Sequence, residues 1–217
     1  KLHLEFDVMK SMPVRAEITD GNANEKANLR KALAPNKLYL LDAGFGEYKL
    51  FAEIHEARSN FLARLRDNAV WETIEERPLS ESDRCAGVQR DMIVHLGSPQ
   101  CRDEIPMPVR VIEIYHRGSS DRPRLSRVSS KKTFRTTDAD YTMLLVTDRM
   151  DLPAEIIALL YRYRWQIELF FRWFKCILGC THLLSLSRNG VSLQVYCALI
   201  ASMLITLWTG RKPTKRT

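Results

Sequence analysis

A short, uninterrupted apolar run constrains the fold of this 217-residue chain more than any other feature. Leu38, Tyr39, Leu40 and Leu41 follow one another without a polar residue, and Asp42 ends the run. Because the side chains of a strand point alternately to its two faces, such a run is typical of a strand that is buried on both faces. The sequence therefore predicts a sheet strand that is buried on both faces and ends at an acidic residue.

The neighbouring segments alternate between strand and helix patterns. Strand-like stretches, with alternating or continuous apolar residues, are residues 2–8, 14–19 and 61–65, the first two of which predict a β-hairpin. Helix-like stretches are residues 24–33 and 47–57. The chain is long enough for one domain with a real core.

Residues 68–138 have a different character. Short strand-like pieces at 70–74, 92–96 and 109–115 alternate with turn-rich stretches, and residues 117–135 are crowded with Arg, Lys and Ser. We interpret this region as a β-rich insertion that ends in a basic loop. That loop is either a solvated surface loop or a contact to DNA.

A further strand is predicted at residues 141–147, and the helix signals of Asp151, Leu152 and Pro153 predict a long helix that runs to about residue 178. At about 100° per residue, four polar or charged residues of this helix fall within an arc of roughly 60°. They are Tyr161, Arg164, Glu168 and Lys175. The adjoining sector is apolar and consists of Leu159, Leu160, Ile167, Phe170, Phe171, Phe174 and Leu178.

Two interpretations of the polar stripe compete. An ordinary amphipathic helix would carry ion pairs from Glu168 to Arg164 and to Arg172. Each such pair contributes only about a few tenths of a kcal/mol, so stability hardly explains so many aromatic and basic residues. In the functional interpretation Glu168 binds a divalent cation, Arg164 and Lys175 hold DNA phosphates, and Tyr161 contacts a strand end.

The net charge and the cysteines of the chain are typical of an intracellular protein that binds a polyanion. The net charge is +7, and five cysteines without framework spacing predict reduced thiols in a cytoplasmic protein. A zinc site at Cys176, Cys180 and His182 is not expected, because no second ligand pair lies at suitable spacing. Residues 195–208 carry no charge but are short for a membrane span, so they predict a buried core helix rather than an anchor.

The polar residues at 161, 164, 168 and 175 have a defined spacing: Tyr is followed after two residues by Arg, after three more by Glu, and after six more by Lys. It resembles the signature of DDE transposases of the insertion sequence four family, and the residues around it, 163–171, resemble that family too. The resemblance spans nearly the whole chain. It implies a ribonuclease-H-like α/β fold, with a mixed sheet flanked by helices, in which two Asp and one Glu bind two metal ions.

The resemblance makes Asp42 the second Asp of that triad, because Gly44 and Phe45 follow it as in the family's Asp-Arg-Gly-Tyr/Phe pattern. Ala43 departs from the pattern where Arg is usual. The alternative for Asp42 is a strand-end cap or turn residue. Asp7 and Asp20 are interpreted as structural, so we expect the first catalytic Asp to lie upstream of Lys1 and the sequence to be incomplete at both ends.

The implied organisation is a core in two parts, residues 1–67 and 139–217, around the insertion at 68–138. The implied chemistry is hydrolysis and transesterification of DNA phosphodiesters at insertion-sequence ends and target DNA. Mg²⁺ or Mn²⁺ would be held by Asp42 and Glu168, in a homodimer on paired ends. With one carboxylate outside the chain, we expect the chain alone to be inactive or nearly so. A non-catalytic DNA-binding remnant and a membrane-associated basic protein are the other candidates.

Overall fold

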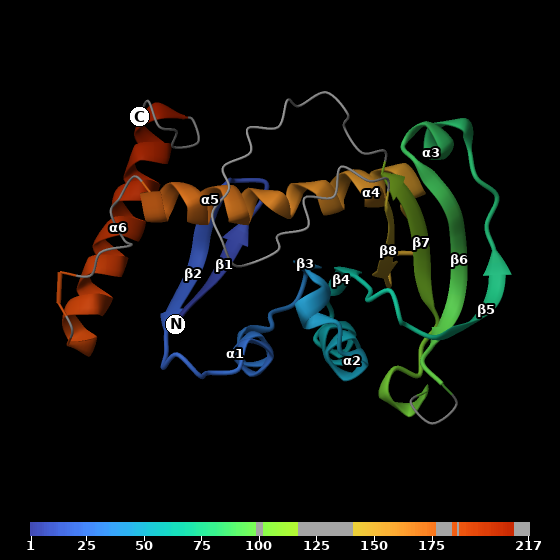
Figure 1. Ribbon diagram of the computed structural model, residues 1–217, viewed down its shortest axis with the longest axis horizontal. Coiled ribbons are helices and arrows are strands. Elements are labelled where there is room, and N and C mark those ends of the chain that lie inside the picture. Colours follow the sequence, from blue (N-terminus) through green and yellow to red (C-terminus); the bar gives the residue numbers. More distant parts are fainter. Residues whose placement is uncertain (99–101, 117–140, 177–183, 186, 211–217) are drawn as a thin grey trace, which may run out of the picture. The chain divides into compact units, whose positions relative to one another are not determined.

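A computed structural model describes residues 1–98, 102–116, 141–176, 184–185 and 187–210 of the chain (Figure 1). The chain forms two compact units. We call Lys1–Ala32 with Leu160–Thr217 the hairpin unit, and Leu33–Leu159 the sheet unit.

The sheet unit is built on a six-stranded sheet in the order β3-β4-β8-β7-β6-β5 (Figure 1). Its strands are β3 (Leu38–Leu41), β4 (Asn60–Arg64), β5 (Trp71–Glu76), β6 (Val88–Leu96), β7 (Val109–His116) and β8 (Tyr141–Thr147). β3 and β4 are parallel, whereas the other neighbours are antiparallel. The sheet is therefore mixed, and the predicted mixed α/β class is confirmed.

The helix α2 (Tyr48–Glu56) joins the two parallel strands, which cannot be connected by a tight turn. It buries Leu50, Phe51 and Ile54, which lie on one helical face. The ring of Phe51 stacks on Phe61 of β4, with centroids 4.5 Å apart. The parallel pairing of β3 with β4 places their carboxyl ends beside each other.

The start of α4 (Ala154–Tyr163) is tied to the antiparallel side of the sheet. Asp83, in the short helix α3 (Glu81–Cys85), forms a capping box with Ser80. Its other carboxylate oxygen accepts a hydrogen bond of 2.8 Å from the backbone N–H of Glu155. Burial raises the pKa of Asp83, but the hydrogen bonds from Ser80 and Glu155 outweigh it and hold that pKa below its usual value.

The hairpin unit contains the antiparallel strands β1 (Leu2–Asp7) and β2 (Met12–Ile18), with α1 (Glu25–Ala32), α5 (Trp165–Cys176) and α6 (Arg188–Thr209). Its core is aromatic and aliphatic and consists of Phe170, Trp173, Phe174, Val195 and Leu199. Partly buried residues of the hairpin, Leu2, Leu4, Phe6, Ala16 and Ile18, pack against this core.

The predicted strands and helices are confirmed to within a few residues at most of their ends. The prediction that the apolar run of β3 is buried on both faces is only partly confirmed, because the run is buried on one face, at Tyr39 and Leu41, and half-buried on the other. The strand pieces within 68–138 form β5, β6 and β7 of the same sheet as β3, β4 and β8. The boundaries of an insertion stay a prediction, and the basic loop at 117–135 lies outside the described residues.

The prediction of one helix from residue 151 to about 178 is wrong. The helix begins at Ala154, after Pro153, and it is divided into α4 and α5 at Arg164. The backbone tightens there, because Arg164 N–H donates to the Tyr161 carbonyl (3.1 Å) and Ile167 N–H to the Arg164 carbonyl (3.3 Å). The part beyond residue 176 lies outside the described residues.

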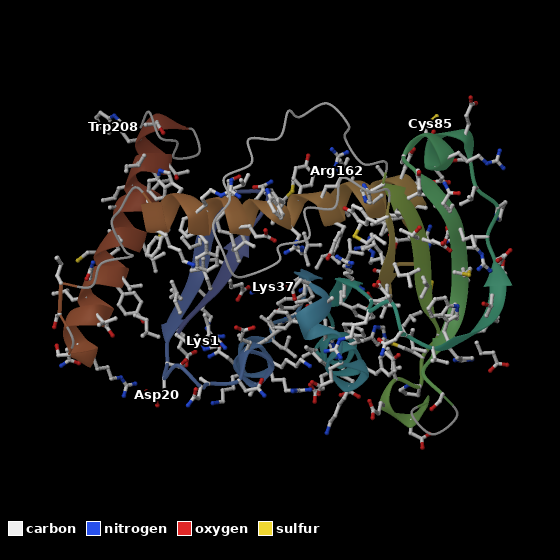
Figure 2. All side chains as sticks on the ribbon, in the orientation of Figure 1. Lys1, Asp20, Lys37, Cys85, Arg162 and Trp208 are labelled. Carbon is white, nitrogen blue, oxygen red and sulfur yellow. The ribbon has the colours of Figure 1, made fainter. Side chains whose placement is uncertain are left out.

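The prediction of a buried C-terminal helix holds along one stripe of α6 only. Val195, Leu199 and Ser202 are buried, whereas Leu204 is 60% and Trp208 92% exposed; Trp208 is labelled in Figure 2. By length and composition α6 is the one described helix that could cross a membrane, although core helices of soluble proteins pass the same test.

Candidate catalytic site

Asp42 stands at the carboxyl end of β3, directly before the 3₁₀ turn η1 (Ala43–Phe45). It is exposed, and its Oδ1 accepts a hydrogen bond of 2.8 Å from the N–H of Gly44. Among the described residues, Oδ2 has no donor. Asp42 therefore caps a turn, as the structural alternative expected, and also keeps one carboxylate oxygen available to a cation.

Gly44 is the residue that lets Asp42 cap the turn at close range. A Cβ at position 44 would lie 3.0 Å from Asp42 Oδ1, which is closer than ordinary van der Waals contact. The Asp-x-Gly pattern thus has a steric basis, and the side chain at position 43 is not part of it.

The hairpin unit brings three of the four signature residues together. The guanidinium of Arg164 lies 2.8 Å from Glu168 Oε1, and its Cζ is 5.5 Å from the centre of the Tyr161 ring. The side chains of Arg164 and Glu168 are 20% and 38% exposed. Tyr161 is only 6% exposed, so its ring lies beneath Arg164 rather than on an open polar stripe.

Lys175 lies further along α5. It follows Glu168 by seven residues, hence about 10.5 Å along the axis on nearly the same face. Its ammonium lies 6.0 Å from the centre of the Phe171 ring, and the residue is exposed. Trp173, rather than Phe171, joins Phe170 and Phe174 in the buried face of α5.

Asp42 belongs to the sheet unit and Glu168 to the hairpin unit. A metal ion shared by these two carboxylates therefore stays a prediction. Within the described parts of the chain, no group of three or more His, Cys, Asp or Glu side chains is gathered in a way that could hold a metal ion.

Two other acidic residues have backbone roles. Asp7 Oδ1 accepts hydrogen bonds of 2.9 Å from the N–H groups of Met9 and Lys10, so it holds the turn between β1 and β2. Asp20 follows β2, and its carbonyl accepts from Ala23 N–H at 3.1 Å (Asp20 is labelled in Figure 2). The structural interpretation of both carboxylates stays a prediction.

Asp148 shows what a purely structural carboxylate looks like in this protein. Its side chain is 2% exposed. Its oxygens accept hydrogen bonds from Phe61 N–H, Asn60 Nδ2 and the His55 ring, each at 3.0 Å. Both oxygens are occupied, in contrast to those of Asp42.

Arg64, the last residue of β4, is not marked by any motif of the sequence. Its proximity to Asp42 depends on the parallel pairing of β3 with β4, which no local motif reveals. The recurrence of a strand pattern at 61–65 after one helix was the only available signal.

The sequence of this chain is similar to those of known proteins. The chain is 30% identical over 210 residues to "Putative transposase y4zB" of Sinorhizobium fredii, which covers 95% of this chain and 52% of that protein. It is 26% identical over 218 residues to "Probable transposase for insertion sequence element IS5377" of Geobacillus stearothermophilus, covering 100% of this chain and 51% of that protein.

A third similarity is short: 36% identity over 53 residues to a protein of Synechocystis described as a transposase for insertion sequence element IS4SA, covering 24% of this chain and 16% of that protein. The chain thus spans about half the length of the first two relatives. The sequence model of the transposase DDE domain matches residues 1–204. The chain belongs to the transposase DDE domain family.

Proposed function

We propose that this chain carries part of the catalytic core of a bacterial, cytoplasmic DNA transposase with a ribonuclease-H-like fold. In this proposal Asp42 and Glu168 hold divalent metal ions, and the protein cuts and rejoins DNA as a homodimer on paired ends. The observation that supports it best is the exposed Asp42 with one unoccupied oxygen, at the end of a strand in a mixed sheet, in a member of the transposase family.

The donor set fits a hard divalent cation. Asp42 Oδ2 and Glu168 Oε2 have no hydrogen-bond donor among the described residues, and carboxylate oxygens are the ligands that Mg²⁺ and Mn²⁺ prefer. When bound, such ions polarise the scissile phosphate and lower the pKa of an attacking water. The two carboxylates supply the negative charge that retains the ions.

In this proposal the basic residues of the signature bind DNA phosphates. Arg164 presents a planar donor group suited to a phosphate, and the Tyr161 ring beneath it limits the positions that the guanidinium can take. Lys175 adds a point charge on nearly the same face of α5. DNA binding should therefore weaken as the salt concentration rises.

A second candidate is a DNA-binding protein without cleavage activity. Ala43 favours it, because the family pattern has Arg at that position. No third carboxylate of this chain is assigned to the metal site, so we expect cleavage by the 217-residue chain alone to be absent or weak.

Metal binding can be tested without cleavage of DNA. Fe²⁺ with ascorbate generates radicals that cut the polypeptide close to a bound ion. We expect cuts near both Asp42 and Glu168, suppressed by excess Mn²⁺ and lost in Asp42→Asn. Asp67→Asn, which removes an exposed carboxylate beyond β4, is the matched control and should keep both cuts. Cuts near only one of the two positions would contradict a shared metal site.

Catalysis is tested on the full-length gene product with labelled DNA from the ends of its own element. Cleavage in Mn²⁺ should disappear in Asp42→Ala and in Glu168→Ala. Robust cleavage that survives both substitutions together would exclude these residues as the metal ligands.

A further inference from the structure

The register of the two parallel strands places Arg64 beside Asp42. Leu38 pairs with Asn60, and the pairing continues to Leu41 with Ala63. One residue further, Asp42 follows β3 at the same level as Arg64, the last residue of β4. Neighbouring strands lie about 4.8 Å apart and residues at equal register share a face, so the two side chains leave the same edge of the sheet.

Arg64 is half-buried, and yet its side chain has no hydrogen bond or ion pair among the described residues. It does not reach the carboxylate of Asp42. The other buried or half-buried arginines whose side chains are described all have partners: they are Arg15, Arg30, Arg77, Arg110, Arg149 and Arg164. Among these arginines, Arg64 thus differs from the others in that its side chain has no partner among the described residues.

A guanidinium stays charged at any physiological pH, so a half-buried one is stabilised by an anion. Asp42, which follows β3 at the same register, accepts a hydrogen bond from the Gly44 N–H and is assigned to a metal ion in the proposed function. Because no carboxylate of the described residues pairs with Arg64, an anion of a bound ligand can take that place. Phosphate is the anion whose geometry the planar Arg donors match in a bidentate way.

We propose that Arg64 binds a backbone phosphate of the DNA strand held at Asp42. It supplies from β4 the positive charge that the family pattern places at position 43, where this chain has Ala. The proposal rests on the proposed function for the identity of the ligand. It needs only residues of the sheet unit, since β3, η1 and β4 all belong to it.

The test measures DNA binding of the full-length gene product without divalent metal, on a fluorescent duplex of random sequence over a series of salt concentrations. Arg64→Gln should weaken binding about ten-fold and reduce the steepness of log K against log salt by about 0.9, the value for one phosphate contact. Arg64→Lys should keep the slope, because the charge stays, but weaken binding about three-fold because the bidentate geometry is lost.

Arg84→Gln is the matched control, because Arg84 is an exposed arginine of α3 in the same unit whose side chain has no partner among the described residues. It should leave the salt slope unchanged. Circular dichroism and thermal unfolding report whether each variant folds. If Arg64→Gln does not fold, Arg64→Lys is used for the test. A slope for Arg64→Gln equal to that of wild type, or a slope for Arg64→Lys lowered by about 0.9, would overturn the proposal.

The two proposals fail in different ways. If Arg64→Gln keeps the Fe²⁺ cuts near Asp42 but lowers the salt slope, the phosphate role of Arg64 is supported and the metal site is intact. If the wild type shows no Fe²⁺ cuts while the slope of Arg64→Gln still falls, the metal site is wrong and the phosphate contact stands.

Discussion

Removal of the Arg110 side chain should destabilise the sheet unit more than any exposed charge can. Arg110 lies in β7 and is 1% exposed, and it forms a two-pronged ion pair with Asp91 of β6, at 2.7 and 2.6 Å. It also donates to the backbone carbonyls of Leu152 and Arg149, in the segment that leads into α4. One guanidinium thus connects two strands to the start of a helix.

The magnitude follows from what is left behind in Arg110→Met. The substitution keeps most of the volume but leaves Asp91, 4% exposed, without its counter-charge. Breaking a buried pair in this way costs about 3–5 kcal/mol. For a unit of this size the loss corresponds to a decrease in Tm of about 10 °C. Replacing both partners, Arg110→Met with Asp91→Leu, should restore part of the loss, because a buried pair can be exchanged for apolar groups at little net cost.

Hydrogen exchange of the β7 amides, measured by mass spectrometry in a urea series, gives the free energy of unfolding of this unit separately from the hairpin unit. Arg90→Met is the matched control: Arg90 pairs with Glu76, but the two side chains are 49% and 58% exposed. That pair should contribute less than about 1 kcal/mol. A loss below 1 kcal/mol for Arg110→Met, or a double variant no more stable than the single one, would refute this reasoning.

Two further predictions concern stability. In α6, Leu199→Ala should cost about 2–4 kcal/mol, whereas Leu204→Ala should cost less than about 0.5, because Leu199 is 4% and Leu204 60% exposed; urea unfolding checks the pair. The depressed pKa of Asp83 contributes stability that is present above its unfolded value near 3.8 and is lost as pH falls through its folded pKa. Urea midpoints between pH 3 and 6 should therefore fall less on acidification in Asp83→Asn than in wild type.

The elements of the fold were predictable because their signals are local. The alternating pattern of β1 and β2, the apolar run of β3 and the Pro before α4 each reflect the geometry of a single segment. The break at Arg164 was not predictable. Residues 154–176 have a continuous helical pattern, and nothing in it marks the tightened turn that the backbone adopts.

The candidate site was predictable only as separate pieces. The signature spacing showed that Arg164 and Glu168 share a helical face, and the structure places them in an ion pair. The burial of Tyr161 beneath Arg164 was missed, since helical periodicity gives a direction but not what covers it. Arg64 was missed because only the parallel pairing of β3 with β4, which no local pattern reveals, brings it to the level of Asp42.

The ion pair between Arg164 and Glu168 does not compete with the proposed metal site. Arg164 occupies Oε1 of Glu168, and Oε2 has no donor among the described residues, so a cation can bind while the pair persists. At these exposures the pair is worth well under about 1 kcal/mol, whereas a bidentate arginine–phosphate contact is the stronger interaction. Arg164 can therefore hold the carboxylate in position before DNA arrives and exchange it for a phosphate afterwards. If the proposed DNA contact forms, the ion pair and the phosphate contact are alternative states of the same guanidinium, which lies 5.5 Å from the centre of the Tyr161 ring in the ion-paired one.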